Sequence, residues 1–392
     1  MKIAILTSGI LPVPAVQGGA VENLIDMYLA FNDQHQLHDI TIYSIAHDEA
    51  KRHPALSSKV NHYRYIDTKS VVAKLRKKLH KAVNGQEYYH YTIEYYLEQA
   101  LQHIQNHDYD AVIVENRPGY VLKLASQTPA RIILHLHNDF LNSSIPHAKE
   151  IYDSATRIIT ISDFITSRVR TIQADDKKCV MVHNGLDLDR FSPEHATPAN
   201  RESLGIGQDD FVLIFTGRVI PEKGIDKLIQ AMLLLKEYQH IRLLVLGSSF
   251  YANEQTDNEF VSNLKERARE LGDRLIFTGY TPYEKVPSML ALANVAVLPS
   301  VWDEPFGMAC LEAMSMGLPV ITTDRGGIKE VANSSTAIIV PADDRLPSRL
   351  AVAILDLYNA PDRCKEMGQQ AHLTAQYFSK DIFAQKLFLS LL

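Results

Sequence analysis

The segment 295–332 restricts the fold more than any other part of the sequence. Val295–Leu298 is a short apolar run, typical of a buried strand in a parallel sheet. After a loop, residues 307–316 have the pattern of a helix that ends at Gly317, where a left-handed backbone costs glycine little. A second apolar run, 319–322, and a Gly-Gly turn into another helix follow. This order predicts a doubly wound α/β unit, in which ligands bind beyond the carboxyl ends of the strands.

Two carboxylates, Glu304 and Glu312, flank the start of this predicted helix. If helix connected them throughout, eight residues would separate them by about 12 Å. The acid and base of ordinary glycosidases lie roughly 5–9.5 Å apart, so we expect these two to contact different parts of one long ligand. The amides of Gly307, Met308 and Ala309 between them can bind an anion. For either glutamate alone, a helix with an acidic first turn is the simpler interpretation.

The run EPFGMACLEAM, followed by GLPVITT, two glycines and a glutamate, resembles the donor-site signature of family 4 glycosyltransferases of the GT-B fold. Its core is two glutamates separated by seven residues, here Glu304 and Glu312. The resemblance implies an α/β protein of two Rossmann-like domains facing a cleft. It implies a retaining, metal-independent hexosyltransferase that uses a nucleotide sugar, with UDP favoured. Glu304 would contact the sugar and Glu312 the ribose, and the implied donor site also includes Phe306, Gly307, Met308 and Ala309.

Length and composition are those of a globular protein with two domains. The 392 residues are 46% hydrophobic and 22% charged, with a net charge of −6 and thus no basic excess for nucleic acid. The sequence has no apolar run long enough to span a membrane and no signal-peptide pattern at its start. Three separated cysteines suit a reducing compartment and exclude a Cys-based zinc site. We expect a cytoplasmic protein without a cofactor.

A glycine-rich turn follows the first predicted strand, residues 2–7. Gly18 and Gly19 open a predicted helix over residues 21–32, and bare amides in such a turn can approach an anion closely. A tight turn that merely packs on the sheet fits the same residues. The resemblance favours contact between this turn and the donor diphosphate.

Histidines gather at the end of another predicted strand, residues 131–136. Side chains alternate along a strand, so His135 and His137 share a face. The pair could indicate a metal, but no third ligand is found at a suitable spacing, and we expect no metal site. In the resembled family a histidine at the end of this strand faces the sugar, and His137 matches it. The pairing of ENRPG with LHLHND resembles the bacterial cell-surface and spore-coat polysaccharide branch, which implies a saccharide or lipid-linked acceptor.

The segment 71–83 reads as a basic amphipathic helix. One face is apolar (Val71, Val72, Leu75, Leu79 and Val83) and the rest is basic (Lys74, Arg76, Lys77, Lys78 and Lys81). Such a helix can lie on an anionic membrane surface, or it can be an ordinary solvated helix. If Lys74–Lys81 contact lipid, the protein would lie at the inner face of the plasma membrane.

In the second half, Gly217 to Gly224 resembles the G-R-x-x-x-x-K-G motif of the family. It connects a predicted strand, 211–216, to a predicted helix. Arg218 and Lys223 would neutralise a diphosphate beside the helix N-terminus, although ordinary surface charge is the alternative. Tyr280 lies in a later turn, which borders the nucleobase in the resembled family.

These patterns predict an acceptor-side domain at residues 1–190, a donor domain at 191–375, and a C-terminal helix at about 376–392 that returns to the first domain. The predicted catalytic set is His137, Glu304, Arg218 and Lys223. Two other functions fit the same fold. A nucleotide-sugar 2-epimerase should show further carboxylates and histidines as proton carriers. A non-catalytic sugar-nucleotide-binding subunit is disfavoured because Arg218, Lys223 and Glu304 are all present.

Overall fold

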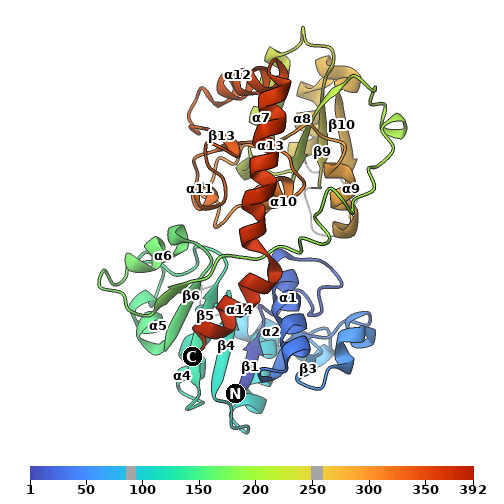
Figure 1. Cartoon of the computed structure of the whole chain (residues 1–392). Coiled ribbons are helices and arrows are strands. Elements are labelled where there is room, and N and C mark those ends of the chain that lie inside the picture. The colour runs from blue at the N-terminus through green and yellow to red at the C-terminus, as the bar shows by residue number, and fades with distance from the viewer. Residues whose placement is uncertain (85–93, 249–258) are drawn as a thin grey trace. The chain divides into compact units, whose positions relative to one another are not determined.

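The computed structural model describes residues 1–84, 94–248 and 259–392 (Figure 1). Its internal contacts divide the chain into two compact units. Unit 1 comprises Met1–Gly185 and Lys380–Leu392, and unit 2 comprises Leu186–Ser379. Each unit is built around one parallel sheet flanked by helices. The predicted α/β class with two Rossmann-like domains is therefore confirmed.

Unit 1 contains a seven-stranded sheet in the order β3-β2-β1-β4-β5-β6-β7. Its strands are β1 (Lys2–Leu6), β2 (Asp39–Ile45), β3 (Asn61–Ile66), β4 (Ala111–Glu115), β5 (Arg131–Leu136), β6 (Arg157–Thr160) and β7 (Cys179–Met181). Its helices are α1 (Ala20–His35), α2 (Val71–Asn84), α3 (Glu94–Ile104), α4 (Tyr120–Ala125), α5 (Ala148–Ser154), α6 (Asp163–Arg170) and α14 (Lys380–Ser390), with short 3-10 turns η1 (Ala50–Arg52) and η2 (Pro54–Ser57).

The edge strand β3 has no counterpart among the predicted elements. Its sequence, NHYRYI, has only its two end residues buried. An edge strand with an exposed face needs no continuous apolar run. The central strand β4, in contrast, is buried along its whole length, including Glu115. The apolar pattern therefore predicted the interior strands of this sheet and missed β3.

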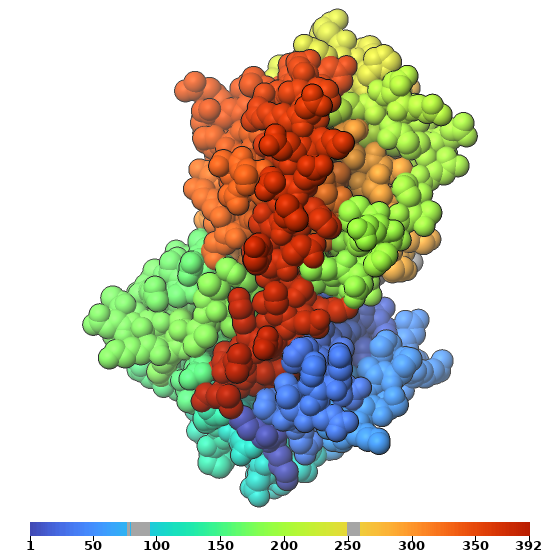
Figure 2. Space-filling view, in the orientation of Figure 1, coloured from blue at the N-terminus to red at the C-terminus, as the bar shows by residue number. Residues whose placement is uncertain are grey.

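The C-terminal helix α14 belongs to unit 1 and packs on α1, beside which it lies on the face seen in Figure 2. Phe388 is buried, with its ring centre 6.1 Å from that of Tyr28 and 6.3 Å from that of Phe31. The ring centre of Phe383 also lies 6.3 Å from that of Tyr28. The last residues of the chain thus complete the core of the unit formed by the first ones.

Unit 2 contains a six-stranded sheet in the order β10-β9-β8-β11-β12-β13. Its strands are β8 (Phe211–Thr216), β9 (Ile241–Leu246), β10 (Leu275–Gly279), β11 (Val295–Leu298), β12 (Val320–Thr323) and β13 (Ala337–Val340). Its helices are α7 (Ile225–Leu234), α8 (Glu259–Arg267), α9 (Val286–Leu290), α10 (Met308–Ser315), α11 (Ile328–Val331), α12 (Leu346–Tyr358) and α13 (Pro361–Ala375), with 3-10 turns η3 (Glu202–Leu204), η4 (Pro221–Lys223), η5 (Arg269–Arg274), η6 (Tyr283–Lys285) and η7 (Gln376–Phe378).

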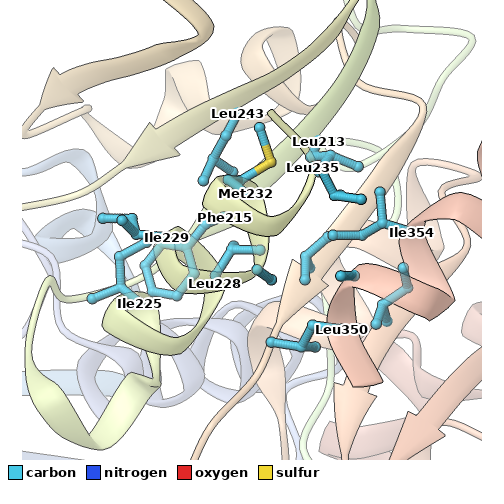
Figure 3. Packing of buried hydrophobic residues seen from close by; sticks show 14 of the residues in the cluster. Leu213, Phe215, Ile225, Leu228, Ile229, Met232, Leu235, Leu243, Leu350 and Ile354 are labelled. Carbon is cyan, nitrogen blue, oxygen red and sulfur yellow. The ribbon is translucent and has the colours of Figure 1, made fainter. Parts of the chain in front are cut away.

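The core of unit 2 lies where α7 and α12 cover β8 and β9. Figure 3 shows Leu228 and Met232 of α7 and Ile354 of α12 converging on Phe215 and Leu243 of the sheet. All five side chains are almost fully buried. This packing anchors β8, the strand from which the Arg218–Lys223 loop emerges.

The packing of α14 predicts a contrast between neighbouring residues on one helix. Phe388→Ala removes a buried ring and should lower the free energy of unfolding by about 3–5 kcal/mol. Leu389→Ala is the matched control, because Leu389 is 60% exposed, and it should change stability little. Urea unfolding of both variants measures the difference. Equal stability of the two variants would contradict the role of α14 in the core.

Candidate functional site

Lys223 and Glu304 meet at the carboxyl ends of β8 and β11. Lys223 ends η4, which follows β8, and Glu304 lies in the loop that follows β11. Because these strands pair in parallel, the two loops leave the same edge of the sheet. Nζ of Lys223 lies 2.5 Å from Oε1 of the buried Glu304. The residues predicted to contact the diphosphate and the sugar are therefore in direct contact with each other.

Two further side chains surround this pair. Ser300 donates a hydrogen bond from its hydroxyl group to the same oxygen of Glu304. Nζ of Lys223 lies 5.6 Å from the ring centre of Trp302, within the range of a cation–π interaction. Neither residue was predicted, because both lie in a loop whose conformation no local pattern determines. Together they fix the carboxylate and the cation in one arrangement.

Glycines allow the surrounding loops to touch backbone to backbone. Gly224 has φ +67°, and a Cβ atom there would lie 2.0 Å from the carbonyl oxygen of Pro299. Gly326 has φ +57°, and its Cβ would lie 2.2 Å from the carbonyl oxygen of Glu304. The amide of Gly327 donates to that same oxygen at 2.7 Å. The backbone of Glu304 is thus in direct contact with the bare backbone of one other turn, at Gly326 and Gly327.

Helix α10 starts four residues after Glu304, so helix does not connect the two glutamates throughout. The helix runs from Met308 to Ser315, so the rise from its first residue to Glu312 is only about 6 Å. The assumption of helix throughout, on which the expected separation of about 12 Å rested, is therefore wrong. The simpler interpretation fails as well, because no acidic residue lies in the first turn and no side chain caps the helix. Gly307 takes the N-cap position with φ +107°.

The other residues predicted at the donor lie around the same edge of unit 2. Gly307, Met308 and Ala309 are half-buried, as is Arg218 in the loop between β8 and η4. Tyr280, in the turn after β10, is 42% exposed. The ring of Phe306, in contrast, is buried and packs edge-on against Phe378 at 5.9 Å. A ligand could therefore contact Phe306 only through its backbone.

Glu312 faces a residue that the sequence analysis did not identify. The hydroxyl of Tyr283, the first residue of η6, donates to Oε1 of Glu312 at 2.9 Å. Burial raises the pKa of the Glu312 carboxyl group to about 7, and the hydrogen bond from Tyr283 lowers it in part. Tyr283 precedes Glu312 by 29 residues, so only the fold could reveal this pair.

In unit 1, one carboxylate joins the two predicted histidines. Glu115 ends β4 and lies opposite His135 in the register with β5. Its Oε2 lies 2.8 Å from Nε2 of His137 and 3.1 Å from Nδ1 of His135. Tyr28 donates to the other oxygen at 2.8 Å. All three members of the Glu–His–His cluster are buried.

This cluster corrects the reasoning that excluded a third metal ligand near the histidines. Among the residues that the structure describes, Glu115, His135 and His137 form a group whose ligand atoms lie within 4.8 Å of one another. The third member comes from the neighbouring strand, which linear spacing cannot show. The present contacts are hydrogen bonds between these side chains, and their distances are normal for that role.

The surroundings of Glu115 and His137 lower the pKa of each group. Burial by itself would raise the pKa of Glu115, but His135 and the hydrogen bonds from both imidazoles hold that pKa well below its usual value. Burial lowers the pKa of His137 to about 4. At neutral pH the cluster therefore contains a carboxylate and a neutral His137 that can exchange hydrogen bonds but carries no positive charge.

The Gly18–Gly19 turn is occupied by a carboxylate. Gly19 is the N-cap of α1 with φ +104°, and a Cβ atom there would lie 2.2 Å from Oε2 of Glu22. Ser8 donates to the other oxygen of Glu22 at 3.3 Å. Burial raises the pKa of Glu22 to about 7. An anion that approaches this turn therefore meets a group that is only partly ionised near neutral pH.

The backbone contact at Glu304 predicts that Gly326→Ala is more damaging than an ordinary glycine substitution. The new methyl group would meet backbone atoms of the Glu304 loop, so that loop must move, at a cost of about 3 kcal/mol or more in unfolding free energy. Guanidinium unfolding measures this loss.

Gly317→Ala is the control for Gly326→Ala, because it tests a left-handed backbone position that has no close backbone contact. Gly317 has φ +74°, but a Cβ atom added there would have nothing within 4 Å, so only the left-handed conformation is penalised, by about 1–2 kcal/mol. Equal losses of unfolding free energy in the two variants would show that the backbone contact at Glu304 contributes nothing to stability.

Comparison with known families identifies both halves of the chain. Residues 32–190 match the family described as Glycosyltransferase Family 4, and residues 196–374 match the family described as Glycosyl transferases group 1. The chain is 29% identical to the Bacillus subtilis (strain 168) protein YtcC, covering 95% of this chain and 86% of that one. It is 28% identical to spore coat protein SA of the same organism, covering 96% and 95%.

Solved structures share the fold at lower identity. The Anabaena protein Alr3699/HepE, in complex with UDP and glucose, aligns over 100% of this chain and 99% of its own, with a TM-score of 0.74 and 19% identity. A glycosyltransferase from Rickettsia africae aligns over 99% and 97%, with a TM-score of 0.75 and 19% identity. With the two family matches along its length, the chain belongs to the family 4 glycosyltransferases of the GT-B fold.

Proposed function

We propose that this glycosyltransferase moves a hexose from a UDP-sugar to a saccharide or lipid-linked acceptor, with retention of configuration and without a metal ion. The observation that carries the proposal is the Lys223–Glu304 contact just before the N-terminus of α10. A cation suited to a diphosphate, a carboxylate suited to sugar hydroxyls and free amides suited to an anion gather at one edge of unit 2.

Relatives support the finer parts of this proposal. Structures of Anabaena HepE contain UDP with glucose, or UDP-glucose, which supports a uridine donor here. The likeness to spore coat protein SA supports a role in building a surface layer, for which we propose a polysaccharide product. Synthesis from a nucleotide sugar fits a cytoplasmic location.

The Lys223–Glu304 pair suggests how the donor is activated. Arg218 and Lys223 stabilise the charge that develops on the leaving diphosphate, an effect often worth several kcal/mol. When Lys223 turns to the diphosphate, Glu304 loses its cationic partner and accepts hydrogen bonds from the sugar hydroxyls. Because the hydroxyl of Ser300 still donates to Glu304, the carboxylate acts as a binding group and not as a free nucleophile. This favours substitution on the same face of the sugar over a covalent intermediate.

The remaining residues have supporting roles in the proposal. Glu312 accepts from the ribose diol, Tyr280 borders the base, and the amides of residues 307–309 contact the diphosphate. His137, held by Glu115, orients the sugar or the acceptor. For Gly18 and Gly19 to contact the diphosphate, Glu22 must first be protonated or displaced, because its carboxyl group lies over Gly19.

The buried Glu–His–His cluster keeps one alternative reaction open. A nucleotide-sugar 2-epimerase would use carboxylates and histidines as proton carriers, and Glu115, His135 and His137 are residues of that kind. An epimerase changes the sugar without any acceptor, whereas the proposed transferase needs one. A non-catalytic subunit would bind UDP without turnover of any UDP-sugar.

The proposed roles of the two glutamates predict different kinetic losses. Glu304→Gln should lower kcat by about 10²–10³-fold with little change in UDP affinity, because its contacts strengthen in the transition state. Glu312→Gln should weaken UDP binding about tenfold and change kcat less, because it contacts the ribose. Calorimetry with UDP and steady-state transfer from a UDP-sugar measure the two effects.

Asp303→Asn is the matched control for these variants. Asp303 is the exposed neighbour of Glu304, and its charged partner is Arg325, 3.9 Å away. Its loss should change neither UDP affinity nor turnover. Identical kinetic profiles for Glu304→Gln and Glu312→Gln would contradict separate contacts.

We also propose that α2 holds the enzyme at an anionic membrane. Its apolar residues face solvent: Val71 is 82% exposed, Leu75 59% and Leu79 58%. Lys74 and Arg76 are exposed beside them, while the side chains of Lys77, Lys78 and Lys81 lie outside the described part of the chain. An exposed apolar stripe on a basic helix supports surface attachment. No helix among the described residues is long and apolar enough to cross a bilayer.

Vesicle flotation tests this attachment. Each basic residue near an anionic surface contributes about 1 kcal/mol, so the protein should float with phosphatidylserine vesicles at low salt and dissociate at high salt. Lys77→Glu with Lys78→Glu should abolish flotation. Lys236→Glu with Lys365→Glu makes the same change in net charge at exposed positions of unit 2 and should not. Absence of wild-type flotation at low salt would rule the attachment out.

A further inference from the structure

The hydrogen bond between Tyr283 and Glu312 engages only one side of the carboxyl group. Tyr283 donates to Oε1 at 2.9 Å. Within the described ranges 1–84, 94–248 and 259–392, Tyr283 is the hydrogen-bond partner of the Glu312 side chain. The second oxygen, Oε2, is therefore available to a ligand. A carboxylate held on one side by a tyrosine can accept on the other side without turning away.

Tyr283 is itself held by the segment that precedes η3. The buried ring of Phe191 packs against it with 5.3 Å between ring centres. The guanidinium carbon of Arg190 lies 5.6 Å from the ring centre of Tyr283. Ser315, at the end of α10, donates to the carbonyl oxygen of Phe191. The same segment thus contacts both the tyrosine and the helix that carries Glu312, and this fixes the distance between them.

We propose that Tyr283 is a positioning residue for donor binding: its hydroxyl group holds Glu312 so that the free carboxylate oxygen accepts from the ribose. The inference rests on the proposed function, specifically on the contact between Glu312 and the ribose diol. Tyr283 acts through Glu312 and need not touch the donor.

A tyrosine in this position also favours the ionised form of Glu312. Burial raises the pKa of that carboxyl group to about 7, and the hydrogen bond from Tyr283 opposes the rise. Without the hydroxyl group the pKa should be higher still. Ribose hydroxyls bind more strongly to a carboxylate than to a neutral acid. The loss of UDP affinity on replacing Tyr283 should therefore be largest in the pH range where Glu312 is ionised in the wild type and protonated in the variant.

Other titratable groups near Glu312 come from several elements. Asp187 and Arg190 act on Tyr283 from the preceding segment. Glu304 and Lys223 lie near Cys310 in the first turn of α10.

The elements packed against α10 bring further groups. Helix α13 carries His372, whose ring forms a hydrogen bond with the carbonyl oxygen of Ser315. Helix α11 carries Lys329 and Glu330, while β11 and β12 carry no ionisable residue. All of these groups remain in a Tyr283→Phe variant. A change in the pH dependence of UDP binding would therefore result from loss of the tyrosine hydroxyl group.

The test compares UDP binding by the full chain and its Tyr283→Phe variant in calorimetry between pH 6 and pH 9. Wild-type affinity should rise with pH through about 7 as Glu312 ionises. The variant should bind about tenfold more weakly at pH 7, and its rise should lie at higher pH. The phosphate groups of UDP titrate equally in both experiments and cancel in the comparison. Tyr238→Phe, which removes a hydroxyl group beside Tyr358 in the same unit, should behave as wild type.

A second ligand tests whether the effect passes through Glu312. Removing the ribose 2′-hydroxyl, by use of 2′-deoxy-UDP, should cost the wild type more affinity than it costs Tyr283→Phe, since the two changes disturb one interaction. Additive losses, or a variant with the wild-type affinity and pH profile, would overturn the inference and leave the proposed function standing. If the wild type binds no UDP at any pH, the proposed function fails and the inference falls with it. A thermal melt shows that the variant is folded.

Discussion

The parallel pairing of β8 with β11 is the constraint on which unit 2 depends. It brings the loop after each strand to one edge of the sheet, where Lys223 meets Glu304. The loops approach so closely that two positions accept no side chain: Gly224 lies against Pro299, and Gly326 lies against Glu304. The Glu304 carboxylate is thereby positioned by backbone contacts of its loop. The core of α7 and α12 beneath it keeps β8 in register.

Each unit contains a buried or half-buried carboxyl group whose pKa is raised to near neutrality. Burial raises the pKa of Glu312 in unit 2 and of Glu22 in unit 1 to about 7. In each case the folded pKa lies above the usual value near 4.5, so each acid favours the folded state most below that value. This stabilising effect is lost as the pH rises through about 7. Glu312 is itself proposed to contact the nucleotide donor, and Glu22 lies over Gly19, which is proposed to contact it.

Local patterns predicted the interior strands and the loops that carry the site, because a parallel sheet needs apolar strands and bare turns at its carboxyl edge. They did not reveal β3, whose edge position tolerates polar residues. They missed the partners of the predicted residues: Ser300 and Lys223 on Glu304, Tyr283 on Glu312, and Glu115 on His137. All but Ser300 join residues 22 to 81 positions apart, and such contacts arise from the fold and not from local sequence. The motif indicated the residues that we propose at the donor site, and contacts made by the fold orient them.

We propose that the carboxyl edge of unit 2 binds a uridine nucleotide. Thermal unfolding of the full chain with a panel of nucleoside diphosphates and their sugars tests this binding. At a hundredfold excess over Kd, a ligand that binds only the folded state adds about 2.7 kcal/mol of stability. We expect UDP and at least one UDP-sugar to raise the melting temperature by several degrees, and Lys223→Ala with Arg218→Ala to remove the effect. No shift with any nucleotide, or an equal shift in that double variant, would contradict the claim.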